Sequence, residues 1–331
     1  MATISENAAN QRILFIDVAR VIAILWIVGF WHLMEYSGDD FKTKYYLPAA
    51  KHISMVMLGL FMFISGNLLG KKKLETGGEI KAFYKSRFLR FYILYTLSAV
   101  IMFWIGKINN LSQLVTTLTA TSTFILPQPL TLWFMSMLTI FYLLTPLIKR
   151  DVKTSLGVAL LFILLHLIIP GGIDDSIFWY YLLYAIGLFT AGNEMVKMII
   201  KKRSTLAVSL ILSLIFFLGA MIYWRIGYLM IVPGIIFVLS LSCLIANKSI
   251  RPVISFIAYG SLCAYLFHRQ IYYVLTELFD VMGIQHPLSL CILVMLPVCL
   301  ITSFCIQRFY DKVLQIAIYN KQKANSTYSQ S

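Results

Sequence analysis

The chain has 331 residues, of which 60 % are hydrophobic and only 13 % are charged. This composition excludes a soluble globular domain, because apolar runs of about 18 residues or more recur along the whole length, as in helices that cross a bilayer. The formal net charge of +14 does not indicate nucleic-acid binding, since the basic residues cluster between the apolar runs. The five cysteines lie in apolar segments without metal-ligand spacing, so no metal is expected.

The apolar runs predict an all-α fold, a polytopic membrane bundle of about ten transmembrane helices. In chain order, the predicted spans are residues 13–33, 48–69, 91–105, 130–148, 156–169, 177–196, 206–223, 228–246, 261–278 and 288–306. Breaks are predicted at Pro170-Gly171-Gly172, Trp224-Arg225 and Arg251-Pro252. The Thr- and Ser-rich stretch 109–123 is predicted to be an interfacial or re-entrant piece. Residues 1–12 and 309–331 are expected to be polar tails that flank one transmembrane domain, residues 13–308.

The distribution of Lys and Arg predicts the topology. With these spans, 21 of the basic residues fall on one side of the membrane and 5 on the other, while Arg20 and Arg269 lie within spans. Cytoplasmic loops carry the excess of positive charge. Both termini are therefore expected in the cytoplasm, which requires an even number of spans.

The first predicted span carries three titratable side chains, Asp17, Arg20 and His32. A charged group at membrane depth costs about 3 kcal/mol or more, so such groups usually face a polar cavity and usually have a function. This concentration makes residues 13–33 the first candidate for a functional site.

Further motifs follow the charged first span. They are the stretch 59–69, which contains Ser65-Gly66-Asn67, then Arg87-Phe88-Leu89-Arg90, Leu132-Trp133-Phe134, residues 142–147, Tyr259-Gly260-Ser261 and Tyr265-Leu266-Phe267-His268. Together with Asp17-Val18-Ala19-Arg20 and His32, and in this order, they resemble the membrane acyltransferase 3 family over about residues 13 to 308.

The resemblance implies an integral-membrane enzyme that moves an acyl group, usually acetyl from acetyl-CoA, to a hydroxyl group. The implied acceptor is a sugar of a surface polysaccharide or a related lipid-linked glycan, and the implied location is the cytoplasmic membrane of a bacterium. The family's catalytic histidine corresponds to His32 and its first-helix basic residue to Arg20. Membrane lipids are the other expected partners, and the oligomeric state is not specified.

The chemistry of these residue types fits the implied reaction. Attack of a hydroxyl on a thioester needs a general base, and a neutral histidine can accept the proton. The alternative for His32 is a hydrogen-bonded histidine at a helix end. Arg20 could neutralise a phosphate of CoA, because a guanidinium keeps its charge when desolvated. Its alternative is an internal ion pair with Asp17, three residues away on the same face.

The spacing of Arg20 and His32 departs from the family, which commonly has ten residues between the two positions where this chain has eleven. At roughly 100° per residue, the extra residue separates the two side chains by about 120° around a regular helix. A single π-bulge absorbs one residue and would restore the alignment. We therefore predict a bulge or a kink between Ile22 and Gly29.

The residues that bind the acyl donor are predicted from two motifs, the stretch 59–69 and Arg87-Phe88-Leu89-Arg90. Arg87 and Arg90 are expected to bind the phosphates of CoA, the alternative being ordinary positive-inside anchoring. Ser65 and Asn67 are expected to line the CoA tunnel, the alternative being close helix packing. The family often has a proline soon after the arginine pair, where this chain has Ile93.

Three residues are predicted to contact the acceptor substrate. Trp133 would stack on a sugar ring or belong to the aromatic belt of the membrane interface. Tyr265 and His268 share one helix face, and His268 would orient the reacting groups or satisfy a buried polar network.

The sequence leaves three functions to weigh. An acyltransferase using acetyl-CoA, or another acyl-CoA, through His32 is the main hypothesis, by direct transfer or through an acyl-histidine. An exporter of a polysaccharide or lipid-linked glycan would work without CoA. A structural subunit would use the buried charges only to pair helices.

Overall fold

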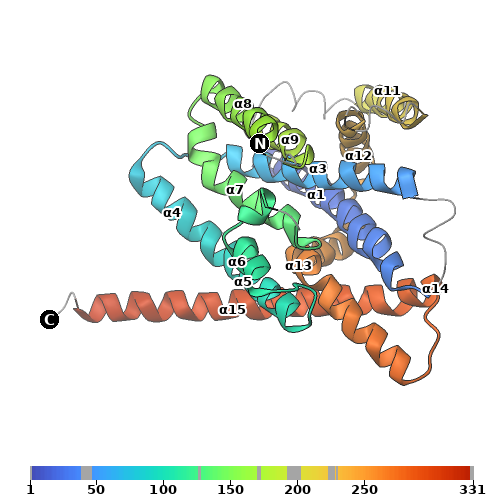
Figure 1. Ribbon diagram of the computed structural model, residues 1–331. Helices are drawn as coiled ribbons and strands as arrows, with labels where there is room; N and C mark the ends of the chain where they lie inside the picture. Colours follow the sequence, from blue (N-terminus) through green and yellow to red (C-terminus); the bar gives the residue numbers. More distant parts are fainter. Residues whose placement is uncertain are drawn as a thin grey trace.

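The computed structural model describes residues 2–38, 47–125, 128–169, 173–191, 203–222, 228 and 230–328. Among them every regular element is helical, which confirms the all-α prediction. The helices are α1 (Ala2–Trp26), α3 (Leu47–Gly70), α4 (Gly77–Arg87), α5 (Ile93–Trp104), α6 (Leu111–Leu118), α7 (Leu132–Ile148), α8 (Val152–Ile168), α9 (Ser176–Thr190), α11 (Arg203–Ile222), α12 (Ile231–Ile245), α13 (Arg251–Val281), α14 (Leu288–Leu290) and α15 (Leu296–Tyr328). Figure 1 shows them gathered in one bundle, from which the end of α15 projects.

Each of the ten predicted spans coincides with an apolar helix. Five are long and apolar enough to cross a membrane, namely Leu14–Tyr36, Ala50–Gly70, Gly77–Trp104, Lys248–Val281 and Leu288–Ala317. The other five are shorter apolar helices of 10–17 residues. The predicted breaks at Pro170-Gly171-Gly172 and Trp224-Arg225 lie outside the described residues. A multi-pass membrane protein follows, while the number of ten crossings stays a prediction.

The helices do not all keep a regular α-helical path. π-Helical turns occur at Ile27–His32 (η1), Phe88–Tyr92 (η3) and Cys291–Met295 (η7). The first continues α1, the second joins α4 to α5, and the third joins α14 to α15. Because π-turns are frequent at functional sites, it matters that the first contains His32 and the second contains Arg90.

The stretch 109–123 enters the bundle as a short hairpin rather than crossing it. Asn110 caps α6, whose far end turns at Ala120 with a left-handed backbone, φ 60°. The carbonyl groups at that end are satisfied by hydroxyl donors from the helix beside it, Tyr92 to Leu118 at 2.5 Å and Tyr95 to Thr117 at 2.6 Å. The predicted interfacial or re-entrant piece is therefore a short helix that packs one face, with Leu114 and Thr117, against the bundle and leaves Leu111 and Val115 exposed.

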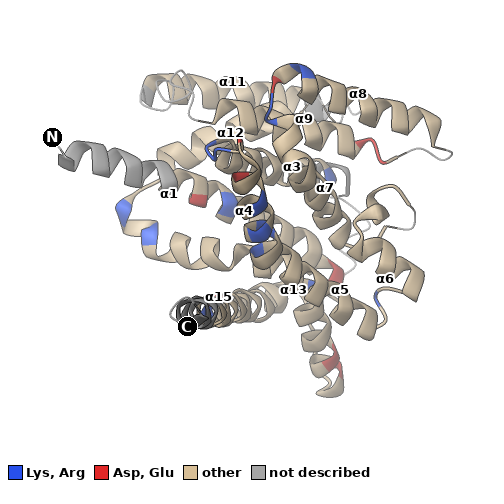
Figure 2. Cartoon of the chain, turned by 90° about the vertical axis from the view of Figure 1, so that its left-hand side faces the viewer, with Lys and Arg blue, Asp and Glu red and all other residues tan. Residues whose placement is uncertain are grey.

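One end of the bundle is basic. It lies where α3 ends, α4 begins and α7 ends, and we call it the basic end; its described side chains include Lys72, Arg87, Arg90 and Lys149. Figure 2 shows Lys and Arg positions gathered around α4 and at the start of α8 on this face. Thr76 and Glu79 form a capping box that starts α4; Arg87 is the last residue of that helix, and Arg90 lies in the π-turn η3 that follows.

Candidate active site

The end of the first helix carries the predicted bulge. The π-turn η1 begins at Ile27, inside the predicted window, and ends at His32. It is held from outside, since the hydroxyl of Tyr272 on α13 donates a hydrogen bond to the carbonyl of Val28 at 3.2 Å. The predicted bulge is confirmed, although it extends beyond Gly29 to His32, and Tyr272 is a supporting residue that the spacing argument did not identify.

His32 meets His268 inside the bundle. Nδ1 of His32 lies 2.8 Å from Nε2 of His268, and the two ring planes differ by only 8°. The ring centroids are 4.8 Å apart. When two imidazole nitrogens are 2.8 Å apart, the ring centres cannot be much farther apart than 4.8 Å. The two nitrogens therefore point toward each other, and the rings meet edge to edge rather than face to face. Both side chains are buried, His268 completely.

The other two charged residues of the first helix form a separate polar cluster. Arg20 pairs with Asp17 at 3.5 Å, as the alternative based on their spacing anticipated. Its Nη2 also donates to the hydroxyl of Ser261 on α13 at 2.7 Å. His32 comes twelve positions after Arg20, roughly 18 Å along the helix axis, so the two side chains are too far apart to contact each other.

A cavity of about 320 Å³ runs inward from the basic end. Its polar lining residues are Arg20, Ser65, Lys72, Arg87, Arg90, Tyr142, Ser261 and Tyr265. The remaining walls are apolar side chains of α3, η3, α7 and α13. Arg20 thus pairs with Asp17 and also faces the cavity, so the ion pair does not exclude contact with a ligand there.

The cavity concentrates positive charge, and among the described residues only Arg20 of its four cations has a carboxylate partner, Asp17. Arg87 lies with its guanidinium carbon 5.6 Å from the ring centre of Tyr142. Its buried Nε has no hydrogen-bond acceptor among the described residues. Partial desolvation, and then the charges of Arg87 and Arg90, lower the pKa of Lys72. A phosphate entering here would satisfy the guanidinium and relieve this repulsion, so the residues fit a polyphosphate such as that of CoA.

An aromatic group separates the cavity from the histidine pair. Tyr265 lines the inner end of the cavity, and its ring lies 6.0 Å from that of His268 on its other side. Phe61 and Phe134 flank Tyr265, with ring centres 6.4 and 5.5 Å away. The hydroxyl of Tyr265 donates to the carbonyl of Thr131 at 3.2 Å. Tyr265 therefore lines the cavity and also contacts the ring of His268.

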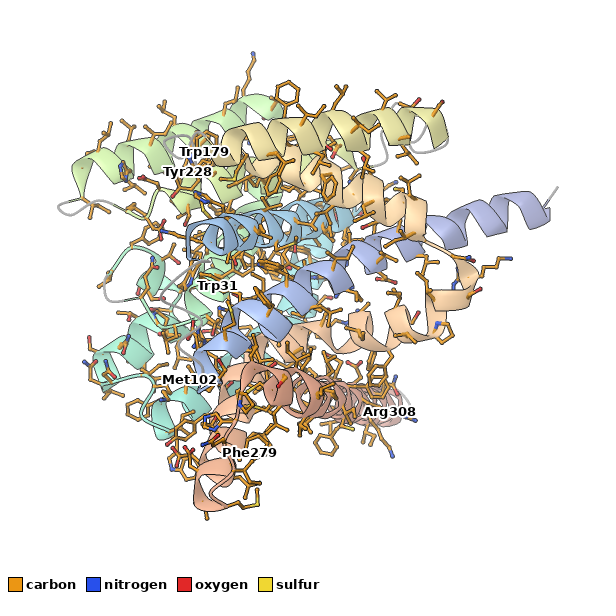
Figure 3. The ribbon with its side chains drawn as sticks, turned by 90° about the vertical axis from the view of Figure 1, so that its right-hand side faces the viewer. Trp31, Met102, Trp179, Tyr228, Phe279 and Arg308 are labelled. Atoms are coloured by element: carbon orange, nitrogen blue, oxygen red, sulfur yellow. The ribbon has the colours of Figure 1, made fainter. Side chains whose placement is uncertain are left out.

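Two predicted residues lie outside this arrangement. The side-chain amide of Asn67 turns toward α9, 3.5 Å from the carbonyl of Gly187, and does not line the cavity. Trp133 packs near Tyr180, with ring centres 6.3 Å apart. Figure 3 shows the molecule from the right-hand side of Figure 1, with Trp31, the neighbour of His32, left of centre in that view.

An ion pair beside the histidines was not anticipated from the sequence. Arg269, which follows His268, contacts Glu35 at 2.7 Å, and its side chain is only 9 % exposed. The backbone carbonyl of Arg269 accepts a hydrogen bond from the Tyr36 hydroxyl at 3.3 Å. The partners are 234 residues apart in sequence, so only the packing of η1 and the following turn Leu33–Tyr36 against α13 brings them together.

Replacing Glu35 with alanine is expected to destabilise the protein by about 2–3 kcal/mol. The substitution leaves the buried guanidinium of Arg269 without this carboxylate, and the value is below that of a fully buried pair because Glu35 is partly exposed. Thermal or denaturant unfolding of the detergent-purified protein measures the change. Glu277→Ala, an exposed position on α13, is the control; equal losses in both variants would mean that the ion pair contributes nothing.

Comparison with known families gives one match. The family described as an acyltransferase domain, acyltransferase family 3, matches residues 13–306. No curated protein matches the chain, and no solved structure does.

Proposed function

The chain belongs to the acyltransferase 3 family, and on that premise we propose that it is a membrane O-acyltransferase using acyl-CoA. The donor would be acetyl-CoA or a similar acyl-CoA, and the acceptor a hydroxyl group of a cell-surface or lipid-linked glycan. We further propose that the basic end lies in the cytoplasm of a bacterium and that the protein resides in the cytoplasmic membrane.

One observation carries the proposal. One cavity is lined both by four cations, Arg20, Lys72, Arg87 and Arg90, and by Tyr265, whose ring centre lies 6.0 Å from that of His268, the hydrogen-bond partner of His32. A donor with its phosphates at the cations would point its thioester toward the histidines. A long donor with an anionic head and a reactive tail requires cations for the head and reactive side chains near the tail.

The reaction follows from the groups present. His32 takes the proton of the acceptor hydroxyl while the oxygen forms a bond to the thioester carbon. The carbon–sulfur bond then breaks, and the protonated histidine returns the proton to the thiolate of CoA. In the acyl-histidine alternative, neutral His32 itself attacks the thioester carbon, the carbon–sulfur bond breaks and CoA leaves as its thiolate. The acceptor oxygen then attacks the acyl-imidazolium, the carbon–nitrogen bond breaks, and the hydroxyl proton passes to the freed imidazole and from there to the thiolate.

The test is transfer of label from donor to glycan. Membrane vesicles that expose the basic end are incubated with radiolabelled acetyl-CoA and total glycan acceptor, and free CoA is added as a competitor. We expect label in the glycan and loss of that label with excess CoA. If acetyl-, succinyl- and other acyl-CoA donors all fail while glycan still crosses the membrane, the exporter alternative replaces the enzyme.

Substitution of the arginine pair separates donor binding from membrane anchoring. Arg87→Gln and Arg90→Gln are each expected to raise the KM for acetyl-CoA about 10- to 100-fold, since a hydrogen bond to a charged group contributes about 1.5–3 kcal/mol. The turnover number should change little. The control is Lys81→Gln, an exposed lysine on α4 outside the cavity. A KM that rises equally in the control would assign the arginines to anchoring.

A further inference from the structure

We propose that His268 is a positioning residue that fixes the tautomer of His32, so that Nε2 of His32 is the reacting nitrogen. The inference rests on the proposed function of this site and deepens it by assigning the atom that reacts and the direction of each hydrogen bond. It is carried by the contacts of the two imidazoles with each other and with the backbone of α13.

The first step concerns Nδ1 of His268, the ring nitrogen that does not contact His32. Its Nδ1 lies 2.8 Å from the carbonyl oxygen of Tyr265 and 3.0 Å from that of Ala264. A carbonyl oxygen only accepts hydrogen bonds, so Nδ1 must carry the hydrogen. Protonating Nε2 as well would bury a second positive charge next to Arg269, which is costly. Nε2 of His268 is therefore a hydrogen-bond acceptor.

The second step follows at the contact between the rings. Nε2 of His268 lies 2.8 Å from Nδ1 of His32. Because the two nitrogens lie at hydrogen-bond distance and the ring planes are nearly parallel, a hydrogen on Nδ1 of His32 points toward this acceptor. His32 must be the donor, and the lone pair of its neutral ring is then on Nε2.

The arrangement also decides where the proton goes during transfer. When Nε2 of His32 takes the proton of the acceptor hydroxyl, the ring becomes an imidazolium whose Nδ1–H still donates to His268. His268 cannot pass a proton onward, because its own N–H points at two backbone carbonyls. The proton stays on His32 and returns to the departing CoA thiolate. An acyl-histidine would likewise form on Nε2.

Three substitutions of His268 test the role by activity. Glutamine can place its amide oxygen near the position of Nε2 and accept from His32, whereas asparagine and alanine are too short. We expect His268→Ala and His268→Asn to lower kcat about 10²- to 10³-fold and to leave the KM for acetyl-CoA within about threefold. His268→Gln should retain activity within about tenfold of wild type. Size-exclusion profiles of the purified variants control for folding.

The tautomer itself is measured without any reaction. Nitrogen NMR of the detergent-solubilised full chain, with ¹⁵N-labelled histidine, distinguishes protonated from unprotonated ring nitrogens, and His32→Asn identifies the His32 signals. We expect His32 protonated at Nδ1 alone in wild type and in His268→Gln, and averaged between tautomers in His268→Ala.

The two readouts keep this inference separate from the proposed function. A wild-type His32 protonated at Nε2 overturns the inference, as does an active wild type whose His268→Ala variant keeps full kcat. A wild type that transfers no acyl group from any donor overturns the proposed function instead, while the NMR result still decides the tautomer.

Discussion

His32→Ala is expected to lower acyl transfer about 10³- to 10⁴-fold, the upper part of the range for a positioned general base. The buried His32–His268 pair is the only histidine pair that the described residues place in hydrogen-bond contact, and it lies directly behind the inner end of the cavity. Initial rates of label transfer from acetyl-CoA at saturating donor measure the loss.

A second substitution removes the ambiguity of a folding defect. Alanine leaves Nε2 of the buried His268 without its donor, which costs about 1–3 kcal/mol. Asparagine keeps an N–H near the position of Nδ1 but has no counterpart of Nε2, so His32→Asn should be folded and equally inactive. His166→Gln, at a half-exposed histidine on α8, should retain wild-type rates. Transfer within tenfold of wild type in both His32 variants would remove His32 from the reaction.

Gly66→Val is expected to destabilise the protein by on the order of 3 kcal/mol, the upper end for overpacking. A Cβ on Gly66 would overlap the backbone carbonyl of Tyr184 on α9, and one on Gly187 would overlap the carbonyl of Phe63 on α3. The two helices therefore touch backbone to backbone, with Gly66 and Gly70 in the GxxxG spacing that permits such approach in membranes. Backbone atoms cannot rotate away, so α3 and α9 must separate.

The consequence reaches the site, because α3 also supplies Phe61 and Ser65 to the cavity. Thermal unfolding in detergent and the yield of monodisperse protein measure the effect. Gly157→Ala is the matched control, since nothing lies within 4 Å of a Cβ at that helical position. The control should be stabilised by about 0.5–1 kcal/mol, as expected for glycine in a helix. An equally stable Gly66→Val would show that the crossing is looser than the structure indicates.

Local sequence patterns predicted part of the geometry of the candidate site. Asp17 and Arg20 are three residues apart, so their pairing follows from helix geometry alone. The eleven residues between Arg20 and His32 required an extra residue in the turn, and the π-turn Ile27–His32 supplies it. The second π-turn lies where this chain has Ile93 in place of the family's common proline, a departure that indicated a different local backbone without specifying a π-turn. The amide of Ile93 closes it by donating to the carbonyl of Phe88, a bond that a proline at this position could not make.

Contacts between residues far apart in sequence could not be predicted from helix periodicity or spacing. His32 and His268 are 236 residues apart, and Ser261 meets Arg20 over a separation of 241. Nothing in helix periodicity says which face of α13 turns toward α1. Tyr272 was detectable only in part, since it continues the face of Tyr265 and His268 at helical spacing.

The sequence by itself determined that this chain forms apolar helices for a membrane, which family it belongs to, and where the first helix deviates from regular geometry. These properties depend on composition and on neighbours within a few turns, where backbone geometry sets the distances. Only the tertiary structure decided that His268 contacts His32 and that Tyr265 both lines the cavity and contacts His268. It also decided that the backbones of α3 and α9 are in direct contact where the two helices cross. Those features depend on how helices distant in sequence pack against one another, which the shapes of both surfaces determine together.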